Sequence, residues 1–224
     1  MRYALLADIH SNLHALEKTL EYIDEIRPDR LVCLGDVVGY GAYPSECISL
    51  IRERCDIVVA GNHDWGVCGE IELTWFNPDA QTAARWTRNL LAPEELKWLW
   101  DLPLTHEENG LFFVHSYPNH PNQWSYVRTA EDAKQALDES GLKTVFVAHS
   151  HLPFVYNDGK RLLVNVGSVG QPRDSDPRAG FCVYDSETRS AEIVRLPYPI
   201  PEAQEAIRKA GLPERLAKRL AMGW

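Results

Sequence analysis

Carboxylate, amide and imidazole side chains recur along this chain in short clusters, most of which follow apolar runs. The clusters are Asp8-Ile9-His10, Gly35-Asp36, Gly61-Asn62-His63-Asp64, His115 and His149-Ser150-His151. Polar side chains that follow the strands of an α/β sheet gather at the edge where such sheets bind ligands. These clusters offer carboxylate, amide and imidazole ligands in numbers that suit two divalent metal ions. Two such ions suit the hydrolysis of a phosphoester.

The spacing within the clusters indicates how one site could be assembled. Two cations about 3.5–4 Å apart need an anionic group between them. Asp36 is the natural candidate, because it leaves its predicted strand between the other clusters. Asp8 and His10 are two residues apart, as are His149 and His151. Since side chains at i and i+2 of an extended segment share a face, each pair is predicted to reach one metal.

These motifs resemble those of the calcineurin-like metallophosphoesterase superfamily. Its pattern is D-x-H, G-D, G-N-H-D/E, a lone His and G-H-x-H, and the resemblance runs over about residues 1–197. Ala148 replaces the usual Gly of the last motif, and no expected ligand is lost. The resemblance implies that a first metal is held by Asp8, His10, Asp36 and His151. It implies that a second is held by Asp36, Asn62, His115 and His149, so that Asp36 bridges the two.

The resemblance also implies catalytic and substrate-binding residues. His63 is expected beside the substrate, where it protonates the leaving oxygen or stabilises the transition state. Asp64 either orients His63 or has a structural capping role. The segment 165–173 resembles the N-P-G-S-x-x-x-P-R segment of the small bacterial and archaeal phosphodiesterase branch, with Val166 in place of the Pro. Arg173 is expected to pair with a phosphate oxygen, and Asn62 to lie against the substrate.

One departure from the superfamily bears on the substrate. Protein Ser/Thr phosphatases carry G-D-x-x-D-R-G, whereas this chain has Gly39 at the position of the second acidic residue. A phosphoprotein substrate is therefore disfavoured, and a phosphodiester is the first choice, ahead of nucleotides and other small phosphoesters. The alternatives are a protein or dinucleoside-polyphosphate phosphatase and a non-catalytic scaffold of the same fold. Mixed oxygen and imidazole ligands suit Mn, Fe, Ni, Co or Zn.

Composition narrows the class of protein. The 224 residues carry a formal net charge of −9, so an extended nucleic-acid-binding face is not expected. No apolar run is long enough for a membrane span, and no signal peptide is evident. The odd number of cysteines includes no C-x-x-C pair, which predicts reduced thiols. We therefore expect a cytoplasmic enzyme that acts on a small phosphoester. A homo-oligomer through the C-terminal helices is an open alternative.

Hydrophobic patterning predicts the elements that position these clusters. Strands are predicted over 2–7, 30–34, 56–60, 111–114, 144–148, 152–157, 161–166, 180–185 and 190–196. Helices are predicted from residue 13 to near Pro28, over 44–54, 78–91, 93–101 and 129–140, and as two short C-terminal helices within about 201–222. The first three strands alternate with helices, which predicts a parallel sheet. With the resemblance, this pattern predicts one domain over 1–224 with a four-layer α/β/β/α sandwich of two mixed sheets.

Several other polar and aromatic residues allow two interpretations. Asn12 either caps the first helix or faces the metals, with capping preferred. Trp65 and Trp75 either pack within a helical layer or wall the substrate pocket. His120 is left open, whereas two further histidines are expected to be structural; these are His14 and His106. The basic residues of the C-terminal helices are expected to form a solvated face.

Overall fold

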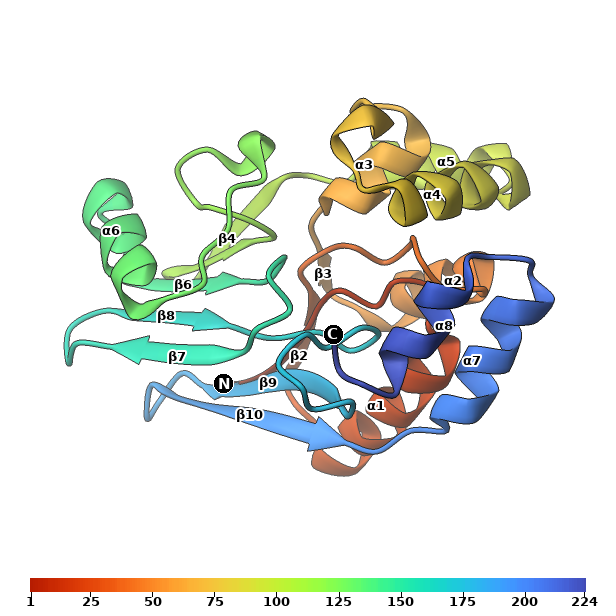
Figure 1. Ribbon diagram of the computed structural model, residues 1–224. Helices are drawn as coiled ribbons and strands as arrows, with labels where there is room; N and C mark the ends of the chain where they lie inside the picture. Colours follow the sequence, from red (N-terminus) through yellow and green to blue (C-terminus); the bar gives the residue numbers. More distant parts are fainter.

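The computed structural model describes residues 1–224 and shows two five-stranded sheets with helices on their outer sides (Figure 1). The first sheet has the order β10-β9-β1-β2-β3, in which β1, β2 and β3 are parallel and β9 and β10 antiparallel. Its strands are β1 (Arg2–Leu6), β2 (Arg30–Cys33), β3 (Ile57–Val58), β9 (Ala179–Asp185) and β10 (Ser190–Leu196). The parallel arrangement predicted for the first three strands is confirmed.

The second sheet is also mixed and has the order β4-β5-β6-β8-β7. Strands β5, β6 and β8 run parallel, while β4 and β7 pair antiparallel to them at the edges. Its strands are β4 (Thr105–Glu108), β5 (Leu111–Val114), β6 (Thr144–Val147), β7 (Phe154–Asn157) and β8 (Leu162–Asn165). Two mixed sheets of this kind agree with the predicted fold class.

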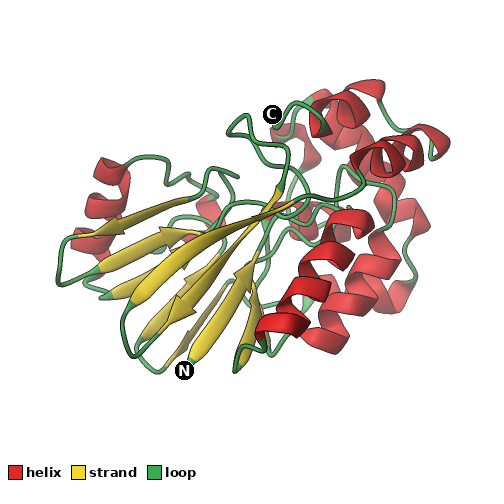
Figure 2. Ribbon diagram, turned by 90° about the horizontal axis from the view of Figure 1, so that it is seen from below, coloured by secondary structure: helices red, strands yellow, loops and turns green.

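Helices cover the outer faces of both sheets, which completes the four layers (Figure 2). Helix α6 (Ala130–Ser140) packs on the second sheet. The first sheet is covered by the remaining helices: α1 (Leu13–Ile26), α2 (Pro44–Arg54), α3 (Asn62–Cys68), α4 (Pro78–Leu90), α5 (Pro93–Trp100), α7 (Ile200–Lys209) and α8 (Glu214–Leu220). Two short 3-10 helices lie in the connections, at Leu73–Trp75 and Pro121–Gln123. No helix combines the length and apolar character that a membrane span requires.

The alternation of side chains along the central strand explains why the sheets stack. Tyr3 and Leu5 of β1 point into the apolar core between the two sheets. Ala4 and Leu6 point the other way, into the core beneath the helices. All four are buried, so this strand is apolar on both faces, as a strand covered on both sides must be. The polar clusters therefore begin only where the strands end.

Three local differences separate the predicted elements from the structure. The strand predicted over 56–60 is assigned only at Ile57–Val58, because the chain already turns toward the site there. Residues 62–68, for which no element was predicted, form α3. His106, which lies outside every predicted element, is part of the edge strand β4, because the polar sequence of that strand has no apolar run.

Candidate metal centre

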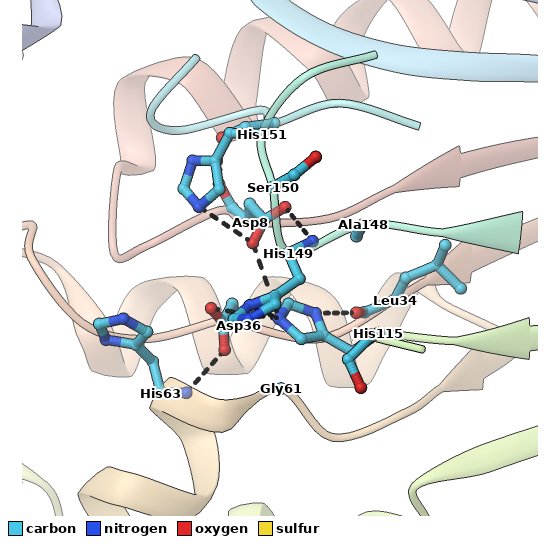
Figure 3. Close-up of polar contacts among 12 residues, drawn as sticks. Asp8, Leu34, Asp36, Gly61, His63, His115, Ala148, His149, Ser150 and His151 are labelled. Atoms are coloured by element: carbon cyan, nitrogen blue, oxygen red, sulfur yellow. Dashed lines mark hydrogen bonds and ion pairs between the residues drawn. The ribbon is translucent and has the colours of Figure 1, made fainter. Parts of the chain in front are cut away.

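The polar clusters converge at one edge of the sandwich, where both sheets contribute side chains (Figure 3). Asp8 follows β1 and Asp36 follows β2 in the first sheet. His115 follows β5 and His149 follows β6 in the second sheet. The expected ligands are all buried, with exposed fractions between 0% and 7%, so the site is withdrawn from bulk water. They are Asp8, His10, Asp36, Asn62, His115, His149 and His151.

The backbone reaches this edge in a conformation that the i, i+2 spacing did not predict. Five expected ligands have left-handed φ angles between 50° and 65°. They are Asp8, His10, Asp36, His149 and His151. Our prediction that the pairs Asp8/His10 and His149/His151 lie in extended segments is therefore wrong. In each pair, both ligands have a left-handed backbone conformation and the residue between them does not. This backbone path directs both side chains of the pair to the same site. A non-glycine residue in this region is held at an energetic cost of about 1–3 kcal/mol, which the surrounding fold must offset.

Each of four histidines is held by one backbone carbonyl. The contacts are His10 Nδ1 with Val38 O at 3.1 Å, His115 Nδ1 with Leu34 O at 2.7 Å, His149 Nε2 with Trp124 O at 2.9 Å and His151 Nδ1 with Gln171 O at 2.5 Å. Since a carbonyl oxygen only accepts, each contacting nitrogen carries the proton. The other nitrogen of each neutral ring then presents a lone pair, and this arrangement is typical of metal-ligating histidines.

The second ring nitrogens of these histidines face one another in pairs. His10 Nε2 lies 3.2 Å from His151 Nε2, and His115 Nε2 lies 3.2 Å from His149 Nδ1. Two opposed lone pairs repel unless a proton or a cation lies between them. Two nitrogens that bind one ion at about 2.1 Å are this far apart when the angle at the ion is about 100°. The donor set therefore fits divalent metal ions.

Asp36 lies between the two histidine pairs. Its Oδ2 is 3.7 Å from His10 Nε2 and 3.4 Å from His115 Nε2. Its Oδ1 accepts the backbone N–H of His63 at 2.7 Å, which fixes the carboxylate. Accordingly, Asp36 belongs to a ligand group with His115 and His149, and to another with His10 and His63. A third group contains Asp8, His10 and His151, in which Asp8 Oδ1 lies 3.3 Å from His151 Nε2.

Burial and charge together set the protonation of these groups in the metal-free protein. Burial raises the pKa of Asp8 to about 8. Burial lowers the pKa of His149 to about 3 and holds that of His10 well below its usual value. Burial also opposes a charge on His115, but the Asp36 carboxylate outweighs it and raises the pKa of that ring to about 9. Burial raises the pKa of Asp36, but the imidazoles around it, His115 first, bring it well below its usual range. In the metal-free protein Asp8 and His115 therefore hold protons near neutral pH that a bound cation would displace, whereas His10, His149 and Asp36 hold none there.

Asn62 is the remaining expected ligand, and its side-chain oxygen is unsatisfied. The residue begins α3 and is 6% exposed. Its Oδ1 is buried without a hydrogen-bond partner. A buried carbonyl oxygen in this state is unfavourable by about 1–3 kcal/mol, which binding to a cation would relieve.

His63 lies beside the ligands, and aromatic rings hold its imidazole. The ring stacks on Phe76 with centroids 4.7 Å apart and planes 7° apart. Tyr40 contacts it at 4.5 Å and His10 at 4.8 Å. Its Nδ1 is buried and has no hydrogen-bond partner. Gly39 packs directly against it, because a Cβ at that position would lie 2.6 Å from Nδ1. No acidic side chain therefore occupies this side of the ring.

The hydrogen bonds of Asp64 do not match the orienting role that we considered for it. The side chain is fully buried, and its Oδ2 accepts the backbone N–H of Asp36 at 2.8 Å and of Gly61 at 3.0 Å. Its Oδ1 accepts the N–H of Val38 at 3.2 Å. The carboxylate thus joins the chain after β2 to the start of α3. These contacts favour the structural role that we considered for Asp64. Both of its carboxylate oxygens accept backbone N–H groups, and neither contacts the His63 ring.

The segment that follows β8 supports the site from the other side. Ser168 Oγ donates to the carbonyl of Asp8 at 2.8 Å, and the N–H of Gly170 donates to the same oxygen at 2.9 Å. A Cβ at Gly170 would lie 1.7 Å from the carbonyl oxygen of Ile9, so only glycine fits there. Arg173 is half-buried beyond this contact, and its buried Nε has no hydrogen-bond partner. One terminal nitrogen of its guanidinium donates to Gln171 Oε1 at 3.0 Å, so Nε is the buried donor that is left for a ligand.

The remaining predicted candidates lie outside the ligand groups. Asn12 caps α1 by accepting the N–H of Ala15 at 3.2 Å, which confirms the capping interpretation. Trp75 is 73% exposed, so its side chain is not part of a closed pocket wall. Trp65 packs edge-on against Trp124 at 5.7 Å. None of the three remaining histidines joins a ligand group; these are His14, His106 and His120.

Three aromatic residues at the site were not singled out from the sequence. Tyr40 and Phe76 contact the His63 ring, and Tyr126 stacks on His149 with centroids 4.2 Å apart. Tyr40 stands inside the glycine-rich segment after Asp36, a signal that could have identified it. Phe76 and Tyr126 lie in irregular connections, where the sequence pattern does not reveal which residues reach the site.

Comparisons with known proteins agree with this geometry. The family model of the calcineurin-like phosphoesterase superfamily domain matches residues 1–189. The chain is 41% identical over 239 residues to the protein MJ0912 of Methanocaldococcus jannaschii, covering 98% of this chain and 97% of that one. A crystal structure of a metallophosphoesterase from Sphaerobacter thermophilus has a TM-score of 0.89 at 36% identity, covering 100% and 99% of the two chains. The protein PH1004 of Pyrococcus horikoshii shares the fold with a TM-score of 0.88 at 22% identity, over 100% and 98%. The chain belongs to the calcineurin-like phosphoesterase superfamily.

Proposed function

We propose that this protein is a dinuclear metal-dependent phosphoesterase that hydrolyses a phosphodiester. The observation that carries the proposal is the pair of opposed imidazole contacts on either side of the Asp36 carboxylate. One ion would be held by Asp8, His10, Asp36 and His151, and the other by Asp36, Asn62, His115 and His149. Mn, Fe, Ni, Co and Zn all suit this mixed donor set.

When bound, such ions would neutralise the charge of the phosphoester and lower the pKa of a water molecule that attacks phosphorus. The residues of the chain prepare that reaction. The carbonyl contacts hold the histidine rings so that no reorganisation is needed when a ligand binds. Burial of the centre strengthens its interaction with the charged phosphoryl group, because the local dielectric constant is low.

His63 and Arg173 are the residues proposed to act on the substrate. The Phe76 and Tyr40 rings hold the His63 imidazole beside the ligands, so its N–H can reach the leaving oxygen. The Arg173 guanidinium, with an unpartnered buried Nε, would donate hydrogen bonds to a phosphoryl oxygen. Gly39 leaves no acidic partner beside His63, which supports a small phosphodiester over a phosphoprotein.

Hydrolysis of bis-p-nitrophenyl phosphate with added Mn²⁺ tests the activity, and a chelator should abolish it. His63→Ala should retain both metal ions but lose turnover by about 10²–10⁴-fold. His106→Ala is the matched control, because that ring lies in β4 outside the ligand groups. Folded protein that hydrolyses no phosphoester with any divalent metal would refute the proposal. Loss of metal from His63→Ala would instead show that His63 is a ligand.

A further inference from the structure

A cleft of about 400 Å³ opens beside the candidate metal centre and is lined mainly by polar side chains. Two tyrosines connect it to the centre. Tyr40 contacts the rings of His10 at 4.7 Å and His63 at 4.5 Å, and Tyr126 stacks on His149 at 4.2 Å. The cleft therefore adjoins the side chains that would hold both proposed metal ions.

Three arginines line this cleft, although the chain as a whole carries a net charge of −9. They are Arg173, Arg215 and Arg219, and Asp79 is the one carboxylate among the lining residues. The guanidinium carbons of Arg173 and Arg219 lie 6.0 and 5.7 Å from the centroid of the same ring, that of Tyr40. Arg219 Nε donates to the Trp224 oxygen, but Asp79 is the one carboxylate side chain among the lining residues, so the side chains of the cleft carry an excess of positive charge.

The arrangement is unfavourable for the protein when no anion is bound. Arg219 is partly buried, and burial together with the neighbouring Arg173 lowers its pKa to about 10. With this pKa the Arg219 guanidinium stays charged near neutral pH. Like charges held together in a partly desolvated cleft repel each other, and an anion between them removes that repulsion.

The two outer arginines come from a part of the chain beyond the family domain. The family match ends at residue 189, whereas Arg215 and Arg219 lie on α8. Helix α8 packs on α7, and α7 packs on α1, which places α8 near the strand ends that carry the metal ligands (Figure 1). Leu216 and Leu220 are buried in this contact, so the helix is fixed and directs its arginines to the cleft. Our expectation that the basic residues here form only a solvated face is wrong for Arg219.

We propose that Arg215 and Arg219, together with Arg173, form a second anion-binding subsite, and that the substrate carries a second phosphoryl group outside the ester that is hydrolysed. This inference rests on the proposed phosphodiesterase function and names its substrate class. Arg173 stands between the metal ligands and α8, so the α8 arginines would bind the more distant phosphoryl group. Arginine suits this role because its guanidinium forms paired hydrogen bonds with phosphoryl oxygens.

Two chromogenic esters test the proposal. One is the p-nitrophenyl ester of thymidine 5′-phosphate, and the other is the same ester with an additional 3′-phosphate. We expect the Mn²⁺-loaded protein to show a kcat/KM about 10-fold higher for the second ester, mainly through KM. Arg215→Gln and Arg219→Gln should each reduce this ratio toward one. Lys218→Gln is the matched control, since it removes a positive charge from the same helix without lining the cleft, and it should keep the ratio.

Each other outcome overturns a distinct claim. If neither ester is hydrolysed by folded, metal-loaded protein, the proposed phosphodiesterase function fails. If both are hydrolysed with equal kcat/KM, the function stands and the second subsite is refuted. The subsite is also refuted if Arg215→Gln and Arg219→Gln keep the wild-type ratio, or if Lys218→Gln lowers it equally. That last result would assign the preference to the general charge of α8.

Discussion

Replacement of Asp64 separates a structural role from a catalytic one. Its buried carboxylate accepts three backbone N–H groups, those of Asp36, Gly61 and Val38. A buried donor left without an acceptor destabilises a protein by about 1–3 kcal/mol. Three such donors would together destabilise the fold by at most about 3–9 kcal/mol. The mutation also removes the cost of burying the carboxylate, and this gain must be subtracted. Because burial raises the pKa of Asp64 to about 7, that relief is substantial.

We therefore expect Asp64→Ala to lower the free energy of unfolding by about 3–5 kcal/mol. For a chain of this length that corresponds to a fall in Tm of about 6–20 °C. Asp64→Asn should be milder, at about 1–3 kcal/mol, because one oxygen can still accept the N–H groups of Asp36 and Gly61. Its amide nitrogen would then face the N–H of Val38 as a second donor.

Urea unfolding and steady-state kinetics on metal-saturated protein check this prediction. Asp132→Ala is the matched control, since that exposed carboxylate also accepts two backbone N–H groups, those of Arg128 and Thr129. It should be milder than Asp64→Ala, at about 0.5–2 kcal/mol. The turnover of folded, metal-saturated Asp64→Asn should stay within about 10-fold of wild type. An unchanged unfolding midpoint with a 100-fold loss of kcat would show that Asp64 acts on His63 or the substrate after all.

Two further predictions concern the metals. Since each proposed ion joins side chains that follow strands of both sheets, chelation should lower Tm. Two ions at 100 times their Kd contribute about 5 kcal/mol, or about 10–20 °C in Tm, and a calorimetric scan in which chelator leaves Tm unchanged would contradict dinuclear binding. Metal affinity should also rise with pH from 6 to 8, because Asp8 and His115, with metal-free pKa values of about 8 and about 9, must lose protons to bind. Calorimetric titrations in buffers of different ionisation enthalpy should detect the released protons, and identical heats in all buffers would oppose this reasoning.

The sequence predicted the sheets and the convergence of the clusters because both depend on local patterns. Apolar runs identify buried strands, and the residues after parallel strands share an edge whatever the details of the turns. The prediction that Asp8 and His10 converge was right although its reason was wrong, because the left-handed backbone at these positions leaves no signature in residue type. Helix α3 was missed because seven residues with a glycine at position 66 carry little helical periodicity.

The contribution of the C-terminal helices could not be predicted for a different reason. A lysine or arginine on an amphipathic helix normally faces solvent, and α8 has the composition of such a helix. Whether Arg219 meets solvent or a cleft depends on how α8 packs against elements almost the whole chain away. The same holds for Tyr126, whose contact with His149 depends on the path of an irregular connection.

The close packing of Gly39 on His63 limits how this protein could change through evolution. Any side chain at position 39 would meet the imidazole and would also have to adopt a φ of +98°, which L-residues rarely do. An acidic partner for His63 therefore cannot be gained there by one substitution, because the backbone between Asp36 and Tyr40 would have to be rebuilt at the same time. A sequence with an acidic residue at position 39 would therefore require a different loop conformation after β2, and not only a different side chain.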